Sequence, residues 1–220
     1  MSNRMSDDGD LLRLGATVSA IQSVLFVVIG LSAVALDVGQ LVEDGFAALA
    51  GSDLALFRLL CSSFVAIAAL GIAITPAERA AVAPAHRGWA LFGANLAYLG
   101  HAGTIAYFSW WLVATRSGVA PTDADEFAPL QWGAGFELVM VGAWVWIIAG
   151  LIRRDRRWPR PFLWLSIAKA TTFWLAFASL FTTSTAAITG AVGVVTLVTG
   201  PLWHGWIATL LRRIASEEQS

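Results

Sequence analysis

The residues of this chain that could do chemistry are a few ionisable side chains within long apolar segments. The single lysine, Lys169, lies in one such segment, and His101, Glu137 and His204 each lie in another. A charged side chain is costly in hydrocarbon, so those that occur there usually face other helices or water and mark a functional site. Lys169 and His204 could therefore bind a small anion or pass a proton inside a membrane.

Polar side chains accompany Lys169 at helical spacing. Ser166 and Thr172 lie three residues before and after it, so the three side chains share one stripe of a helix. That stripe predicts a helix face that looks into a bundle and not toward lipid. Further candidates for the lining of a ligand or ion pathway come from the other apolar segments: His101, Glu137, Arg58 and Gln22.

Each candidate also has an ordinary structural explanation. Arg58 could extend its aliphatic stem to the outer headgroups, or it could pair with Glu137 inside the bundle. His101 and His204 could be hydrogen-bonded contacts between helices. The headgroup alternative fits Lys169 less well, because about 12 Å separates it from the nearer membrane edge, while its side chain reaches roughly 6 Å.

The segments that must position these residues are long enough to cross a membrane. The 220-residue chain is 57% hydrophobic and 13% charged, whereas a soluble domain is about a quarter charged. A helix needs about 20 mostly apolar residues to span a hydrocarbon core of roughly 30 Å. Six segments qualify, over residues 14–36, 54–75, 89–114, 131–152, 161–182 and 186–211. The sequence predicts an all-α polytopic membrane helix bundle with six transmembrane helices, which form a single domain over residues 1–220.

The positions of the prolines support these boundaries. Six prolines lie between the segments or at a segment's first position, where a missing backbone N–H does no harm: Pro76, Pro84, Pro121, Pro129, Pro159 and Pro161. The seventh, Pro201, follows Gly200 within the last segment and leaves the carbonyl of Leu197 without its helical partner. Gly200 and Pro201 therefore predict a kink just above His204, which could gate a pathway through the bundle.

Basic residues predict which side of the membrane each connection faces. Eleven arginines lie in the two chain tails and in the second and fourth connections between segments: Arg4, Arg13, Arg79, Arg87, Arg153, Arg154, Arg156, Arg157, Arg160, Arg212 and Arg213. The first and third connections, at about 37–53 and 115–130, are acidic. Because cytoplasmic connections carry an excess of Lys and Arg, both termini are predicted in the cytoplasm and the protein in a bacterial cytoplasmic (inner) membrane. The cluster Arg153, Arg154, Arg156 and Arg157 could in addition bind anionic lipid.

Composition argues against several other classes of protein. The net charge of −1 gives no general attraction to nucleic acid, and a lone cysteine, Cys61, excludes an internal disulfide. No set of Cys and His has zinc spacing, so neither a metal nor a cofactor is expected. One alternative is a b-type haem held by His101 and His204, although their estimated depths differ by about 8 Å. Another is signal-peptide cleavage after Ala35, which would leave five helices.

Three functions remain open from the sequence. The first is a small transporter, channel or ligand-binding bundle with a polar interior around Lys169 and His204. The second is a non-catalytic assembly, regulatory or lipid-contacting protein, and the third is a b-type haem redox subunit. An enzyme is less favoured, because the segment 131–152 lacks the serine of a rhomboid-like protease. A single cysteine also cannot form the Cys-x-x-Cys of the quinone-reducing epoxide enzymes.

The end of the last segment carries a resemblance to known proteins. It reads Pro-Leu-Trp-His-Gly-Trp over residues 201–206, and Arg212 and Arg213 follow. This ending, together with the six-helix plan, resembles uncharacterised six-helix bacterial integral membrane proteins that are grouped under domains of unknown function. The resemblance covers one helix and implies no substrate and no catalytic residue.

Overall fold

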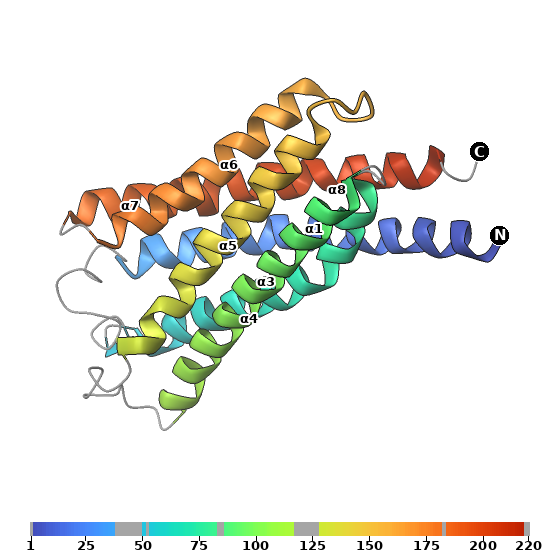
Figure 1. The fold of residues 1–220 in the computed structure, drawn as a ribbon. Helices are drawn as coiled ribbons and strands as arrows, with labels where there is room; N and C mark the ends of the chain where they lie inside the picture. Colours follow the sequence, from blue (N-terminus) through green and yellow to red (C-terminus); the bar gives the residue numbers. More distant parts are fainter. Residues whose placement is uncertain are drawn as a thin grey trace.

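The protein is all-helical in the part of the chain that its computed structural model describes, residues 2–37, 50–51, 53–82, 86–116, 128–181 and 184–217. The elements are α1 (Ser2–Ala35), α3 (Leu54–Ala81), α4 (Arg87–Ala114), α5 (Ala128–Ile152), α6 (Arg160–Ser179), α7 (Thr185–Gly193), the π-helix η4 (Val194–Thr199) and α8 (Gly200–Glu217), as Figure 1 shows. No strand occurs in these ranges. The prediction of an all-α bundle is confirmed at this level.

Five stretches of these helices are long and apolar enough to cross a membrane. They are Asp8–Ala35, Leu54–Ala81, Gly135–Ile152, Arg160–Ser179 and Ala186–Glu217, the last of which runs through α7, η4 and α8. The helix α4 has the same length as α3, 28 residues, but it carries Asn95 and His101 beside several Trp and Tyr residues and does not belong to this set. Five of the six predicted spans therefore meet the criteria of length and composition.

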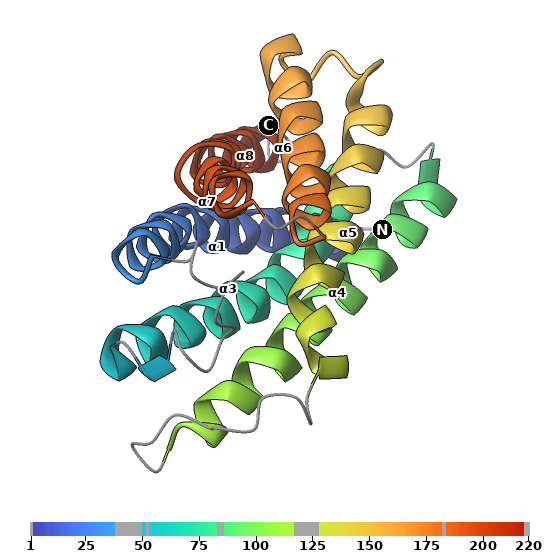
Figure 2. The ribbon, with the colours of Figure 1, turned by 90° about the vertical axis from the view of Figure 1, so that its left-hand side faces the viewer.

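The helices close into a ring around a central space. Each packs against the next in the order α1, α3, α4, α5 and α6, and the unit of α7, η4 and α8 lies between α6 and α1. Figure 2 shows α1 beside α3 and α8, with α5 and α6 paired on the adjoining side. The two termini lie at the same end of the bundle (Figure 1). Most of the acidic connections at 37–53 and 115–130 lie outside the described residues.

The helix α3 extends beyond its predicted end. The prediction that Pro76 lies between segments is wrong, because α3 continues through Pro76 to Ala81. Just before the proline, the Thr75 hydroxyl donates to the carbonyl of Gly71 at 2.7 Å. Beyond it, Ala77 is fully buried against Gly15 of α1, so packing between helices outweighs the hydrogen bond that Pro76 removes. The extra turns carry Glu78 into the bundle.

The last predicted helix is irregular where Pro201 was expected to kink it. The six residues of η4 form a π-helix directly before Gly200 and Pro201, and the N–H of Gly200 donates to the carbonyl of Val195. A Cβ atom on Gly200 would lie 2.6 Å from the ring of Phe26, so a glycine is needed where α8 crosses α1. π-Helical turns are rare and often occur at functional sites. This one ends one turn before His204.

Candidate functional site

A small cavity lies in the centre of the helix ring. Its volume is about 20 Å³, which leaves room for one or a few water molecules and for no organic substrate. All six long helices line it, with Gln22, Phe26, Ile67, Gly71, Ile74, Glu78, His101, Glu137, Val141, Trp144, Val145, Lys169, Phe173, Trp203 and His204. The walls are thus mostly apolar but contain one lysine, two histidines and two glutamates.

Lys169 and His204 contact each other directly across α6 and α8. The Nζ atom of Lys169 lies 2.7 Å from Nε2 of His204, and the lysine is only 1% exposed. An ammonium and an imidazolium both lack an acceptor, so this hydrogen bond requires one of the two bases to be uncharged. At most one of the two bases in this pair is therefore charged, and a proton that the pair takes up can lie on either nitrogen.

Aromatic rings form the remaining surroundings of the lysine. Nζ lies 3.9 Å from the ring centroid of Trp203 and 5.5 Å from the centroids of Phe26 and Phe173. Phe26 also stacks on the His204 imidazole at a centroid distance of 5.1 Å. These rings surround the pair, and their π faces stabilise a cation on Lys169.

Ser166 and Thr172 join α6 to the last helical unit on either side of Lys169. The indole Nε1 of Trp203 donates to Oγ of Ser166 at 2.9 Å. The Thr172 hydroxyl donates to the carbonyl of Lys169 at 2.9 Å and lies 3.0 Å from the hydroxyl of Thr199 in η4. Both predicted residues thus hold α6 in place and do not line the cavity.

His101 and Glu137 form a second ionisable pair, between α4 and α5. Nδ1 of His101 lies 3.3 Å from Oε1 of Glu137, without the orientation of a hydrogen bond. The contact is therefore electrostatic and attractive only when the imidazole is protonated. Gly71 of α3 makes room for this imidazole, since a Cβ at that position would overlap it, and Gly100 lets α4 approach the backbone of Glu137.

Glu78 is a cavity residue that sequence reasoning missed. It is 3% exposed, and its Oε2 accepts a hydrogen bond from Nε1 of Trp144 at 2.7 Å. The miss follows from ending the second segment at residue 75. A signal was present, because residues 67, 71, 74 and 78 recur at steps of four, three and four and all line the cavity.

Gln22 belongs to the cavity, whereas Arg58 does not. The Gln22 amide donates from Nε2 to the carbonyl of Ile67 at 3.0 Å, and among the described residues its Oε1 has no hydrogen-bond partner. Arg58 donates to the carbonyl of Thr115 at the end of α4. Glu137 faces His101 instead, so the alternative of an Arg58–Glu137 pair is wrong.

The predicted gate residues contact α1. The hydroxyl of Ser23 donates to the carbonyl of Pro201 at 2.8 Å. Gly200 packs on Phe26, which in turn stacks on His204. A change in the π-helix would therefore reach the Lys169–His204 pair through a single aromatic ring.

The arginine-rich connection between α5 and α6 is built around one ion pair. Nη2 of Arg157 lies 2.7 Å from Oδ2 of Asp155 and 3.3 Å from the carbonyl of Ala81 at the end of α3. Partial burial alone would raise the pKa of the Asp155 carboxyl, but hydrogen bonds from Arg157 and its charge outweigh that effect and lower this pKa below its ordinary value. Arg153, Arg154 and Arg156 are exposed.

The site does not fit a haem. The cavity is far smaller than a porphyrin, and Nε2 of His204 already bonds Lys169. Among the described residues, no group of three or more His, Cys, Asp or Glu side chains could hold a metal ion. The chemistry that this arrangement supports is transfer of protons between buried bases and carboxylates.

Comparison with protein-family models, curated proteins and solved structures finds no match to this chain. The resemblance of residues 201–213 to uncharacterised six-helix membrane proteins therefore stays a prediction.

Proposed function

We propose that this protein is a small proton-binding transporter or channel that crosses a bacterial cytoplasmic membrane six times, with both termini in the cytoplasm. The contact of Lys169 with His204 carries the proposal. Two buried bases in contact, beside the buried carboxylate of Glu78 and the partly buried carboxylate of Glu137, are typical of proton relays in membrane pumps and transporters. A structural role alone would not require groups that are so costly to bury.

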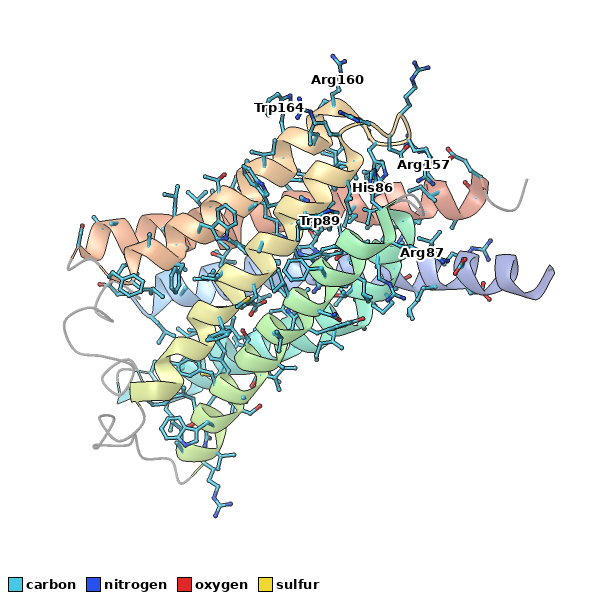
Figure 3. All side chains as sticks on the ribbon, viewed as in Figure 1. His86, Arg87, Trp89, Arg157, Arg160 and Trp164 are labelled. Carbon is cyan, nitrogen blue, oxygen red and sulfur yellow. The ribbon has the colours of Figure 1, made fainter. Side chains whose placement is uncertain are left out.

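The six-span topology rests on the neighbours of α4. This helix is 28 residues long, or about 42 Å, and packs between α3 and α5, both of which are long and apolar enough to cross a membrane. Its polar His101 faces the cavity and not lipid. His86, Arg87 and Arg157 lie toward the end of the bundle where the two termini emerge (Figure 3), which favours a cytoplasmic position for that end.

The charges around the cavity favour a proton over an anion as the transported or coupling ion. With both glutamates ionised and Lys169 charged, the lining has one negative charge in excess. A proton on His101 would neutralise this charge, whereas a small anion would add to it. The small volume of the cavity also favours protons and water.

Proton flux into vesicles tests the proposal. Purified protein is reconstituted into proteoliposomes that contain the pH-sensitive dye pyranine, and a potassium gradient with valinomycin sets the membrane potential. We expect flux above that of empty vesicles. Lys169→Arg should keep the charge but lose about tenfold or more of the flux, because a guanidinium does not release its proton. Lys169→Ala should lose the flux and also weaken the fold.

Leu175→Ala provides the matched control on the same helix, since Leu175 is 58% exposed on the lipid side of α6. This variant should conduct like the unchanged protein. Flux no greater than in empty vesicles, or equal flux in all three variants, would contradict a proton pathway through Lys169.

A second candidate function is a lipid-contacting or regulatory protein. The exposure of Arg153, Arg154 and Arg156 favours it, because exposed guanidinium groups can bind the headgroups of anionic lipids. Arg157 is paired with Asp155 and is less available for such a contact. Replacement of the three exposed arginines by glutamine should then abolish stabilisation of the detergent-purified protein by added phosphatidylglycerol, measured by thermal unfolding. Stabilisation that persists in this variant would argue against the arginine patch.

A further inference from the structure

Glu78 differs from the other ionisable residues of the cavity in its position along the bundle. It lies three residues before the end of α3 at Ala81, or about 5 Å along the axis, whereas Lys169 lies nine residues, or about 14 Å, after the start of α6 at Arg160. Both helix ends meet at the same connection, because Arg157 bonds the carbonyl of Ala81. Glu78 is therefore the ionisable cavity residue that lies between the Lys169–His204 pair and this end.

The bonding of Glu78 leaves its carboxylate able to take up a proton. Its Oε2 accepts from the neutral indole of Trp144 and not from a cation. Among the described residues, no direct ion pair joins Glu78 to Lys169, although both line the cavity and their charges interact. An ion pair would hold the carboxylate in one charge state, whereas a single neutral donor and a water-sized space do not.

Trp144 is itself held in place. It is 1% exposed, and its ring packs on Gly93 of α4, where a Cβ would overlap it. The glycine thus brings the indole from α5 to α3 in a fixed orientation. Trp144 is a positioning residue for the carboxylate.

Resting on the proposed function, we infer that Glu78 is the carboxylate that exchanges protons between the central cavity and the end of the bundle that carries the termini. A proton leaves the nitrogen of Lys169 or His204 and passes through cavity water to the Glu78 carboxylate, which becomes a carboxylic acid. Release of the same proton to water beyond Ala81 restores the carboxylate. No oxidant, reductant or leaving group takes part.

Infrared difference spectroscopy across a pH change tests this role without any need for transport. A protonated carboxyl has a carbonyl stretching band that shifts in heavy water and is distinct from the bands of carboxylates and amides. In the lipid-reconstituted protein we expect such a band to appear and vanish with pH. Glu78→Gln should remove it, whereas Glu217→Gln should leave it intact, because Glu217 is an exposed residue near the end of α8 with 54% of its side chain accessible.

Trp144→Phe supplies a second test in which the carboxylate is retained. It keeps an aromatic ring at this position and removes the N–H that bonds Glu78, together with part of the indole that packs on Gly93. We expect the Glu78 band to change its position and the proton flux to fall, while circular dichroism and the thermal unfolding midpoint report an intact bundle. If Glu78→Gln does not fold, the band position in Trp144→Phe decides the question.

The outcomes separate this inference from the proposed function. A pH-dependent band that is unchanged in both Glu78→Gln and Trp144→Phe overturns the role of Glu78, even where the unchanged protein conducts protons. Proton flux in Glu78→Gln equal to that of the unchanged protein overturns it as well. A band that is lost in Glu78→Gln while the unchanged protein itself does not conduct supports proton exchange at Glu78 and contradicts transport instead.

Discussion

Two side-chain pairs of this protein each contain a basic residue and are equally close, but they differ in chemistry: Lys169–His204 in the cavity and Arg157–Asp155 in the connection between α5 and α6. Both have a closest distance of 2.7 Å. In the connection, opposite charges meet and the guanidinium also bonds the end of α3. In the cavity, two bases meet, and no carboxylate bonds either nitrogen directly among the described residues.

The difference leads us to expect a structural role for the Arg157–Asp155 pair and not for the Lys169–His204 pair. An arginine with an aspartate is stable over the whole physiological range of pH and fixes the geometry of a turn. Two bases in contact carry at most one charge, so the state of the pair changes with the arrival or loss of a proton. Substitutions at the two pairs should therefore have opposite effects on stability and on proton flux.

The largest expected effect is that of Lys169→Met on proton flux. Methionine has a similar length without a proton to donate, so flux in proteoliposomes should fall by about two orders of magnitude or more. Stability should be unchanged or higher, because a buried ionisable group is replaced by an apolar one. Thermal unfolding in detergent measures this second quantity. A large loss of stability with normal proton flux would contradict this prediction, because Lys169 would then have the structural role that we expect of Arg157.

Gly71→Ala should have the next largest effect. The added Cβ would overlap the His101 imidazole, so the ring must shift and its contact with Glu137 must change, at a cost of about 1–3 kcal/mol in the free energy of unfolding. Proton flux should fall as well. Gly150→Ala is the matched control, since no atom lies within 4 Å of a Cβ placed there, and it should stabilise α5 by up to about 1 kcal/mol. Equal effects of the two substitutions would contradict the close packing of α3 on His101.

Arg157→Gln should weaken the fold without blocking the cavity. It removes the ion pair with Asp155 and the hydrogen bond to Ala81, which together contribute about 1 kcal/mol at this partly exposed position. The thermal unfolding midpoint should drop by a few degrees, while proton flux per folded protein stays close to that of the unchanged chain. Flux that falls as far as in Lys169→Met would place Arg157 in the pathway.

The smallest expected effect is the pH dependence contributed by Asp155. Its pKa is lower in the folded protein than in the unfolded chain, so the folded state binds fewer protons at this group. The stabilisation is present above the unfolded pKa and is lost as pH falls through the lowered one. The free energy of unfolding, measured from neutral to acidic pH, should decline slightly less in Asp155→Asn than in the unchanged protein. The difference between the two declines should be about 1 kcal/mol or less. A steeper decline in that variant would contradict the sign.

Part of the candidate site could be predicted because its signals are local. Lys169, His101, Glu137 and His204 stand out as ionisable groups within apolar segments, and each of them lines the cavity. Arg58 shares that signal but lies against Thr115 near the end of α4. Its place near a helix end could be estimated from residue counts, whereas its bonding partner comes from another helix.

Glu78 and the Lys169–His204 contact show what local signals cannot supply. A helix usually ends before a proline, so Pro76 predicts the end of α3. The helix continues because the following turn is buried against α1. Estimated depths place Lys169 and His204 at similar levels in the membrane. Depth does not tell whether α6 and α8 bring Nζ of Lys169 and Nε2 of His204, which are 35 positions apart in the sequence, into contact.

The sequence by itself determined the helices, their apolar character and the stripe that carries Lys169, because periodicity and hydropathy depend on residues a few positions apart. The tertiary structure decided which charged groups meet, where α3 ends and that the last helix opens into a π-turn beside Gly200. These features depend on contacts between helices, since a buried side chain finds its partner only when the ring of helices has closed around it.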